Sequence, residues 1–351
     1  MSNKPEILLD HRGTAGIVTL NRPAALNAVT RAMVRTLREA LEGWRHDGDV
    51  SRIIVTAAGG RAFSAGGDLR AIYEAGRAGR QEESIGFWRE EYALNAAIKH
   101  YPKPYVALID GIVMGGGVGI SVHGSHRVAG DRFEFAMPEV GIGFFPDVGA
   151  TWFLPRAPGE IGTYCALTGA RLKAADALAA GLATHRVASV RLGELVEALC
   201  GTASVDAILA AFAEPPGNGL IAHRRAIDRI FAASSVEEML ALLDAEAAAA
   251  SNDARWAGEA AAAIRVKAPL SLKIARAQMR RGRDWSFEEC MRAEFRVVSR
   301  VAYGHDFYEG IRAVIIDKDN RARWRPPTLA EVTAESVERH FAPLEFELAL
   351  P

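Results

Sequence analysis

The sequence predicts an α/β fold that is followed by a helical C-terminal region. Short runs rich in β-branched residues alternate with amphipathic runs in the first part of the chain, a pattern typical of strand-helix-strand units. Further on, the composition shifts to alanine, leucine, glutamate and arginine, which favour helices. At 351 residues the chain exceeds the usual size of one domain. We therefore expect a core with the functional site over residues 1–200 and a helical region over residues 201–351.

The predicted strands can be placed in order along the chain. They are GIVTL (16–20), RIIVTAA (52–58), YVALID (105–110), RVAG (127–130) and FEFA (133–136). Between the first two, apolar residues recur at helical spacing at Met33, Leu37, Leu41 and Trp44. A second helix is expected to open at MGGG (114–117).

Three Ser/Thr-x-x-Glu patterns predict helix starts in the C-terminal region. They are Ser235 with Glu238, Ser286 with Glu289, and Thr328 with Glu331. In a capping box, the hydroxyl and the glutamate each satisfy a backbone N–H at the start of a helix. AEPPGNG (213–219) is the clearest predicted loop.

Composition excludes several classes of function. The chain has 42 basic and 43 acidic residues and a formal net charge of −1, which argues against a nucleic-acid partner. Its three cysteines are far apart, which fits a reducing compartment and offers no zinc site. His123 and His126 lack an acid at metal-binding spacing, so we interpret them as structural and expect no metal.

The N-terminal sequence MSNKPEILLD has no apolar signal core and is not rich in arginine, so we expect a cytoplasmic location. The stretch that most resembles a membrane span is YVALIDGIVMGGGVGISVHG (105–124). It contains Asp110, His123 and a glycine run, which favour a strand, a turn and a helix over a span. We therefore expect no membrane partner.

Two glycine clusters, AFSAGGDLR (62–70) and GIVMGGGVGISVHG (111–124), are candidate ligand-binding turns. Glycine lets a backbone turn sharply and present its N–H groups closely to a ligand. Ile120 breaks the dinucleotide-binding pattern, and no P-loop is present. Two interpretations stay open: tight turns required for packing, or helix-start amides that form an oxyanion hole.

Two acids, Glu139 and Asp147, stand alone in the apolar stretch FAMPEVGIGFFPDVGATWFLP (135–155). Taken singly, each fits a helix cap, a loop tip or an ion-pair partner. A buried acid without a partner tends to neutralise itself, so a tuned catalytic carboxyl is the alternative.

Taken together, these motifs resemble the crotonase (enoyl-CoA hydratase/isomerase) superfamily. The resemblance rests on LNRPAALNAV (20–29), both glycine clusters and MPEVGIGFFPDVGATWFLP (137–155). WREEYALN (88–95), PYVALIDGIVMGGGVGISVHG (104–124) and GHDFYEGIRAVIIDKDNRARWRP (304–326) are most similar to the 3-hydroxyisobutyryl-CoA hydrolases within it. The resemblance implies a crotonase-like spiral of ββα units with a helical C-terminal region.

The resemblance also implies the residues of a site for an acyl-CoA. The amides of Gly67 and Gly116 would hold the thioester carbonyl, and Glu139 and Asp147 would be the catalytic acids. Other substrate-binding residues are implied at Ala65, Gly66, Asp68 and Glu91. Coenzyme A is part of this small-molecule substrate, and no other cofactor is implied.

One departure from the superfamily pattern bears on the reaction. Hydratases of the superfamily use a second glutamate where this chain has Gly119. Loss of such a proton-transfer group costs about 10²–10⁴ in rate. We therefore expect hydrolysis of 3-hydroxyisobutyryl-CoA, as in valine breakdown, with Glu139 as nucleophile or general base and Asp147 near the 3-hydroxyl. A hydratase- or isomerase-type reaction on another acyl-CoA and non-catalytic acyl-CoA binding are the alternatives, and the oligomeric state is left open.

Overall fold

The computed structural model describes residues 5–215, 217 and 223–350, and the strands in these residues form two sheets. The six-stranded sheet has the order β1 (Ile7–Arg12), β2 (Ala15–Leu20), β3 (Arg52–Ala57), β5 (Tyr105–Ile109), β7 (His126–Ala129) and β10 (His185–Arg186). The four-stranded sheet has the order β4 (Ala62–Ser64), β6 (Ile112–Met114), β8 (Glu134–Ala136) and β9 (Leu172–Lys173). All five predicted strands are present.

From β3 to β8, consecutive strands alternate between the two sheets. β3, β5 and β7 lie in the larger sheet, and each is followed by a strand of the smaller one, β4, β6 and β8 respectively. Neighbours among these strands pair in parallel, as Ile54 does with Val106 between β3 and β5, while β1 with β2 and β8 with β9 pair antiparallel. Helices follow each strand pair before the chain returns to the larger sheet. The predicted α/β fold of ββα units is confirmed.

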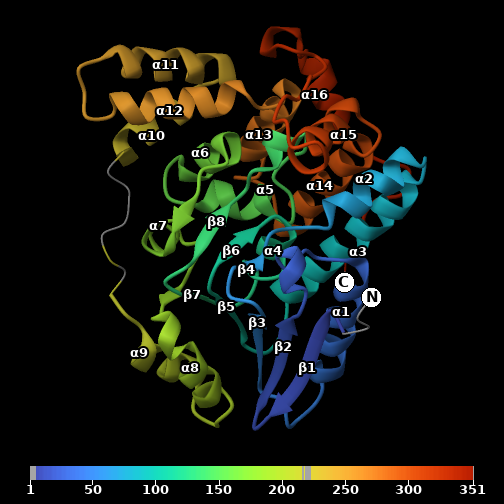
Figure 1. Cartoon of the computed structure of the whole chain (residues 1–351), viewed down its shortest axis with the longest axis vertical. Helices are drawn as coiled ribbons and strands as arrows, with labels where there is room; N and C mark the ends of the chain where they lie inside the picture. The colour runs from blue at the N-terminus through green and yellow to red at the C-terminus, as the bar shows by residue number, and fades with distance from the viewer. Residues whose placement is uncertain (1–4, 216, 218–222, 351) are drawn as a thin grey trace.

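Helical segments connect the strands and cover the sheets (Figure 1). In the first part of the chain they are η1 (Pro23–Ala25), α1 (Arg31–Arg45), α2 (Leu69–Arg77), α3 (Gln81–Lys99), α4 (Gly116–Gly119), η2 (Glu139–Ile142), α5 (Ala150–Phe153), η3 (Leu154–Arg156), α6 (Ile161–Thr168) and α7 (Ala174–Ala179). The predicted helix with Met33, Leu37 and Leu41 is α1, whose buried face carries these three side chains.

The elements beyond β10 are helical in the described residues, as predicted, and loops such as 317–328 connect them. These elements are η4 (Ser189–Arg191), α8 (Leu192–Leu199), α9 (Val205–Phe212), α10 (Arg224–Phe231), α11 (Val236–Ala248), α12 (Ala254–Arg265), α13 (Pro269–Arg281), α14 (Phe287–Val301), α15 (His305–Ile311), the π-helical η6 (Arg312–Ile316), η7 (Leu329–Glu331) and α16 (Ala334–Phe341). Part of the predicted loop 213–219 lies outside the described residues.

The capping predictions have different outcomes. Ser286 and Glu289 form the complete capping box of α14. Ser235 caps α11 through its hydroxyl, but the Glu238 side chain accepts from Ser234 instead of Ser235. Thr328 does not cap, because only the short turn η7 follows and its hydroxyl donates to the Glu331 carboxylate.

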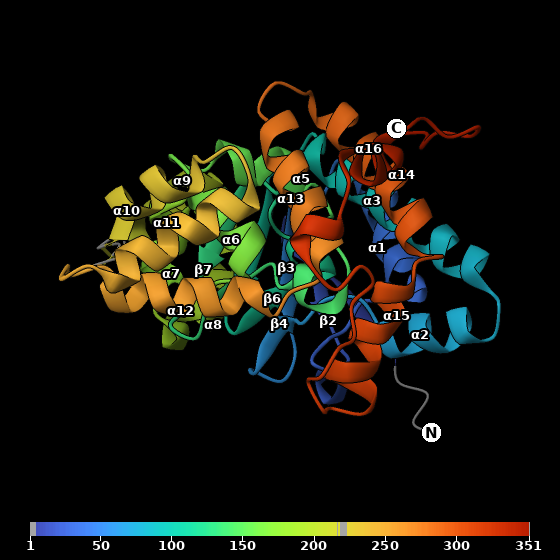
Figure 2. The same ribbon diagram turned by 90° about the horizontal axis from the view of Figure 1, so that it is seen from above.

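The C-terminal helices pack against the strand-rich part of the chain. Figure 2 shows α10, α11 and α12 to one side, with α14 and α15 beside α2 and α3 on the other. α14 contacts α3 and α5, and α15 contacts α2 and η2. One hydrophobic cluster contains residues from Ile7 to Leu348. The helices from α13 onward therefore share a core with the sheets, and the predicted division at residue 200 stays a prediction.

Phe307 is a central contact between these parts. Its side chain is 1% exposed, and its ring centroid lies 5.0 Å from that of Phe144 and 5.9 Å from that of Trp88. We predict that Phe307→Ala lowers the free energy of unfolding by about 3–5 kcal/mol, because it removes a buried aromatic side chain and leaves a cavity. Urea denaturation measures this loss.

The matched control is Phe346→Ala, since Phe346 is 72% exposed. We expect its effect to stay within about 0.5 kcal/mol. A similar, small effect of both substitutions would mean that α15 does not dock through Phe307.

Candidate active site

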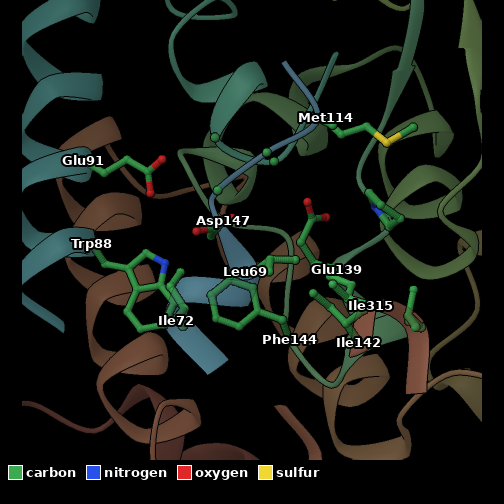
Figure 3. Close-up of a pocket in the computed structure, with 18 of the residues that line it drawn as sticks. Leu69, Ile72, Trp88, Glu91, Met114, Glu139, Ile142, Phe144, Asp147 and Ile315 are labelled. Atoms are coloured by element: carbon green, nitrogen blue, oxygen red, sulfur yellow. The ribbon is translucent and has the colours of Figure 1, made fainter. Parts of the chain in front are cut away.

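A cavity of about 300 Å³ lies between the smaller sheet, α3 and the C-terminal helices. It brings together seven of the eight residues implied by the resemblance, which come from well-separated parts of the chain. These are Ala65, Gly66, Gly67, Glu91, Gly116, Glu139 and Asp147. Figure 3 shows Glu91, Asp147 and Glu139 around this space, with apolar side chains such as Ile72 and Phe144 beneath them.

Two backbone amides approach each other in the wall of the cavity. Gly116 is the first residue of α4, and Gly67 precedes the N-cap Asp68 of α2. A carbon added at Gly116 would lie 3.5 Å from the Gly67 nitrogen. Among the described residues, neither amide donates to a protein acceptor, as is usual for N–H groups at helix starts. Both remain able to donate to one ligand oxygen.

Glycine conformation makes this approach possible. The residues before the two amides, Gly66 and Gly115, have φ angles of +107° and +46°, which residues with a Cβ rarely adopt. A carbon added at Gly115 would also lie 3.3 Å from the Gly66 Cα atom. The two turns therefore need glycine for conformation and, at Gly115, for space.

Glu91 extends from α3 to the Gly116 turn. Its side chain is buried, and its Oε1 atom is 2.5 Å from the place that a Cβ on Gly116 would occupy. In the part of the chain that the structure describes, this oxygen has no hydrogen-bond partner. This oxygen of Glu91 can therefore accept a hydrogen bond, or donate one when protonated, beside the amides of Gly67 and Gly116.

Glu139 is the first residue of η2 and is also buried. Its Oε1 atom lies 3.4 Å from the position of a carbon added at Gly115, on the second glycine turn. Its Oε2 atom has no hydrogen-bond partner within residues 5–215, 217 and 223–350. The Oε2 atom, held beside the two glycine turns, is therefore able to act on a ligand.

Asp147 follows Pro146 in the buried turn that leads into α5. Its Oδ2 atom accepts a hydrogen bond of 2.8 Å from the hydroxyl of Tyr92, which is the next residue after Glu91 on α3. The tyrosine fixes one oxygen of the carboxyl group.

Burial controls the charge of this site. It raises the pKa of Glu91, Glu139 and Asp147, because water no longer stabilises the ionised forms. The negative charge of Asp147 raises the pKa of Glu91 and Glu139 further, while the Tyr92 hydroxyl opposes the increase at Asp147. The acids therefore retain protons at higher pH than exposed carboxyl groups, and ionisation of one disfavours ionisation of the next.

The remaining implied residue, Asp68, lies outside the cavity lining. Its carboxylate accepts from the amide of Ala71 at the start of α2 and from Arg22 at 3.0 Å. It holds the turn that presents Gly67. A direct contact of Asp68 with substrate stays a prediction.

Four further residues of the candidate site were not predicted from the sequence. Tyr92 binds Asp147, Glu294 and Gln278 bind the backbone around Asp147, and Lys267 lines the cavity. Tyr92 follows Glu91 directly and could have been suspected from that spacing. The other three lie in C-terminal helices or beside them, and no local pattern connects them to residue 147.

The histidines have structural positions, in agreement with their interpretation from sequence. His123 Nε2 lies 2.7 Å from the Val148 carbonyl oxygen, and burial lowers the pKa of His123 to about 4. The ring is therefore neutral and donates to that carbonyl. Among the described residues, no group of three or more His, Cys, Asp or Glu side chains could hold a metal ion.

A sequence model of the enoyl-CoA hydratase/isomerase family matches residues 15–341. The chain belongs to this family. The mitochondrial 3-hydroxyisobutyryl-CoA hydrolase of Danio rerio is 45% identical over 98% of this chain and 92% of its own length. The Homo sapiens protein of the same name is 43% identical over 97% of this chain and 89% of its own length.

Two solved structures are similar to this chain over nearly the full length of both chains. One is titled a carnitinyl-CoA dehydratase from Mycobacterium thermoresistibile, with 44% identity, a TM-score of 0.92 and 99% coverage of both chains. The other is titled an enoyl-CoA hydratase from Rhodobacter sphaeroides 2.4.1, with 39% identity, a TM-score of 0.91 and coverage of 99% of this chain and 100% of that one. This likeness confirms the predicted crotonase-like spiral.

Gly119 distinguishes this member of the enoyl-CoA hydratase/isomerase family from the hydratase pattern. A carbon added there would lie 2.8 Å from the Asn95 Nδ2 atom and 2.8 Å from the Val148 Cβ atom. Contacts under 3 Å require neighbours to move, so the space for a glutamate at position 119 is already occupied.

In the part of the chain that the structure describes, no helix is long and apolar enough to cross a membrane.

The buried acids give a prediction about stability. A folded-state pKa above the unfolded value contributes stability below the unfolded pKa, and this stability is lost as pH rises through the folded pKa. Since the pKa of Glu139 is raised, we expect Glu139→Gln to increase the melting temperature, and the increase to be larger at pH 8 than at pH 5. Calorimetry at both pH values measures the difference.

The exposed Glu335→Gln is the matched control, and we expect its effect on melting temperature to be small at both pH values. Equal melting temperatures of wild type and Glu139→Gln at pH 8 would contradict a destabilising buried carboxylate at residue 139.

Proposed function

We propose that this chain hydrolyses the thioester of 3-hydroxyisobutyryl-CoA to 3-hydroxyisobutyrate and free CoA. The observation that carries the proposal is the placement of two buried acids, Glu139 and Asp147, in one cavity with the amides of Gly67 and Gly116. The curated relatives that bear this enzyme name support it, since they are 43% and 45% identical over nearly the whole chain.

The two amides would act as an oxyanion hole. As the thioester carbonyl carbon becomes tetrahedral, its oxygen gains negative charge, and N–H groups already aimed at it need no reorganisation. Each such donor contributes roughly 3 kcal/mol to the transition state. In this arrangement Gly67 and Gly116 bind the oxygen, because their amides line the cavity and have no acceptor among the described residues.

Glu139 would act on the carbonyl carbon. In its ionised form it either attacks the carbon directly, giving an acyl-enzyme anhydride and CoA thiolate, or takes a proton from a water that attacks. Water then completes the covalent route by cleaving the anhydride. Both routes give one carboxylic acid and one thiol, and both require a carboxyl oxygen without a hydrogen-bond partner, such as Glu139 Oε2 among the described residues.

Asp147 and Glu91 would recognise the substrate hydroxyl. Both carboxyl groups line the cavity, whose walls are largely apolar because of Leu69, Ile72 and Phe144. A small branched acyl group fits these walls, and its 3-hydroxyl would satisfy buried polar groups that an unsubstituted acyl group leaves unpaired. The hydroxyl of Tyr92 keeps one oxygen of Asp147 fixed beside the cavity.

Hydration or dehydration of another acyl-CoA is the second candidate. It is favoured by the names of the two similar solved proteins, a dehydratase and a hydratase, and by the position of Glu91, whose carboxyl reaches the Gly116 turn and could serve as a second acid. The lack of space for a glutamate at Gly119 argues against the usual hydratase pair.

Substrate choice tests the proposal. We predict that kcat/KM for 3-hydroxyisobutyryl-CoA exceeds that for isobutyryl-CoA by at least about 10²-fold, since a site that binds a hydroxyl strongly rejects the analogue without it. Release of free thiol, followed with a thiol reagent, measures both reactions. Loss or gain of the enoyl absorbance of methacrylyl-CoA or crotonyl-CoA without thiol release would support hydratase chemistry instead.

Lys267 is placed to bind the nucleotide part of CoA. It is the sole lysine or arginine among the described residues that line the cavity, and it lies between α12 and α13. Burial lowers the pKa of its ammonium group, and no described side chain pairs with it. A carbon added at Gly141 would lie 3.1 Å from the Lys267 Nζ atom. We propose that a CoA phosphate supplies the missing partner.

Truncated substrates test this role of Lys267. We predict that Lys267→Met raises KM for the CoA thioester about 10-fold at similar kcat, because a charge-assisted hydrogen bond contributes roughly 1.5–3 kcal/mol. The same acyl group on pantetheine, which lacks the nucleotide phosphates, should show little change. Lys173→Met, outside the cavity lining, is the control. Equal losses for both thioesters would contradict a phosphate contact.

We also propose that the protein acts in the cytoplasm and without a metal or redox cofactor. Thioester hydrolysis needs a nucleophile or base and a means to stabilise the oxyanion, and neither function requires a second cofactor. The curated relatives are mitochondrial by name, so cell fractionation is the test of location.

A further inference from the structure

The turn that carries Asp147 is held by a second buried acid, Glu294 on α14. The Oε2 atom of Glu294 accepts from the amide of Gly149 at 2.7 Å, and its Oε1 atom accepts from the amide of Thr151 at 2.8 Å. The side chain is 0% exposed. Both oxygens are thus committed to the backbone immediately after Asp147.

Other side chains hold the residues on both sides of these two amides. Gln278 on α13 donates to the Pro146 carbonyl at 2.9 Å and to the Thr151 hydroxyl at 2.8 Å. His123 donates to the Val148 carbonyl at 2.7 Å. The clamp, defined here as Glu294, Gln278 and His123, therefore reaches the turn from three separate parts of the chain.

The clamped backbone is strained. Val148 has a φ angle of +52°, which is costly for a β-branched residue, and Gly149 follows at +90°. Such a conformation persists only when its surroundings impose it. The strain places the Asp147 side chain in the cavity, where Tyr92 binds one of its oxygens.

The charge of Glu294 also affects the pKa of the proposed catalytic acid Glu139. Burial and the charge of Asp147 together raise the pKa of Glu294 to about 8, and the amides of Gly149 and Thr151 oppose this increase. The charge of Glu294 in turn raises the pKa of Glu139, and also those of Tyr92 and Cys290. An ionised Glu294 therefore disfavours ionisation of Glu139.

We propose that Glu294 is a positioning residue, which orients the turn of Asp147 through two backbone amides and, when ionised, disfavours ionisation of Glu139. The roles of Asp147 and Glu139 in turnover rest on the proposed function, but the orientation of Asp147 and the charge state of Glu139 do not. Gln278 and His123 supply neutral hydrogen bonds to the same turn, whereas Glu294 supplies a group that can carry charge.

Glu294→Gln tests this role, because it keeps the shape but removes the charge and one acceptor. We expect kcat to fall about 10- to 100-fold, since small displacements of a catalytic group have effects of this size. We also expect the acidic limb of the kcat profile to move to lower pH, because the charge of Glu294 no longer raises the pKa of Glu139, the group that acts on the carbonyl carbon. Carbon-13 NMR of carboxyl-labelled glutamate reads the Glu139 titration without any turnover.

Glu288→Gln is the matched control, since it changes the same group on the same helix but at a partly exposed site that pairs with His100. It should leave kcat and the Glu139 titration unchanged. Urea denaturation of both variants establishes that they are folded. An unchanged Glu139 titration in folded Glu294→Gln would overturn the proposal, whether or not kcat falls. Absence of thiol release by the wild type would contradict the proposed function alone, because the NMR titration still tests Glu294.

Discussion

The close approach of two glycine turns is the constraint on which the site depends. Gly66 and Gly115 adopt positive φ angles at the ends of β4 and β6, and the following amides of Gly67 and Gly116 face the same cavity. The parallel pairing of β4 and β6 brings the turns together, since both strands end at the same edge of the smaller sheet. The alternation of strands between two sheets is therefore what turns two distant glycine motifs into one donor pair.

The buried acids of the cavity lower the stability of the fold when they ionise. A carboxyl group in an apolar cavity is costly to ionise, and the raised pKa values of Glu91, Glu139 and Asp147 reflect that cost. The C-terminal helices nevertheless close the cavity, and hydrogen bonds to α13 and α14 hold the Asp147 turn in place. Stability and reactivity at this site therefore have the same origin, the exclusion of water.

Local sequence patterns were sufficient to predict the parts of the site that are contiguous in the chain. Glycines before a helix and acids in an apolar stretch have meaning within a few residues, so Gly67, Gly116, Glu139 and Asp147 could be found, with the family resemblance assigning their roles. Glu294 and Lys267 could not, because they reach the site only through packing across long sequence separations. Thr328 failed as a cap for a related reason, since its pattern is local but the helix it requires is absent.

The shared core also affects how the protein is made. Cavity-lining residues extend from Ala65 to Ile315, so a chain emerging from the ribosome presents both glycine turns and all three acids before the helices that cover them exist. Apolar surface such as Phe144 and Trp88 stays uncovered until Phe307 has been synthesised. Partly built chains of this kind are prone to aggregate. Chaperone binding during translation should therefore be strongest just before residue 307 emerges. Until then, acyl-CoA should not protect the growing chain from aggregation.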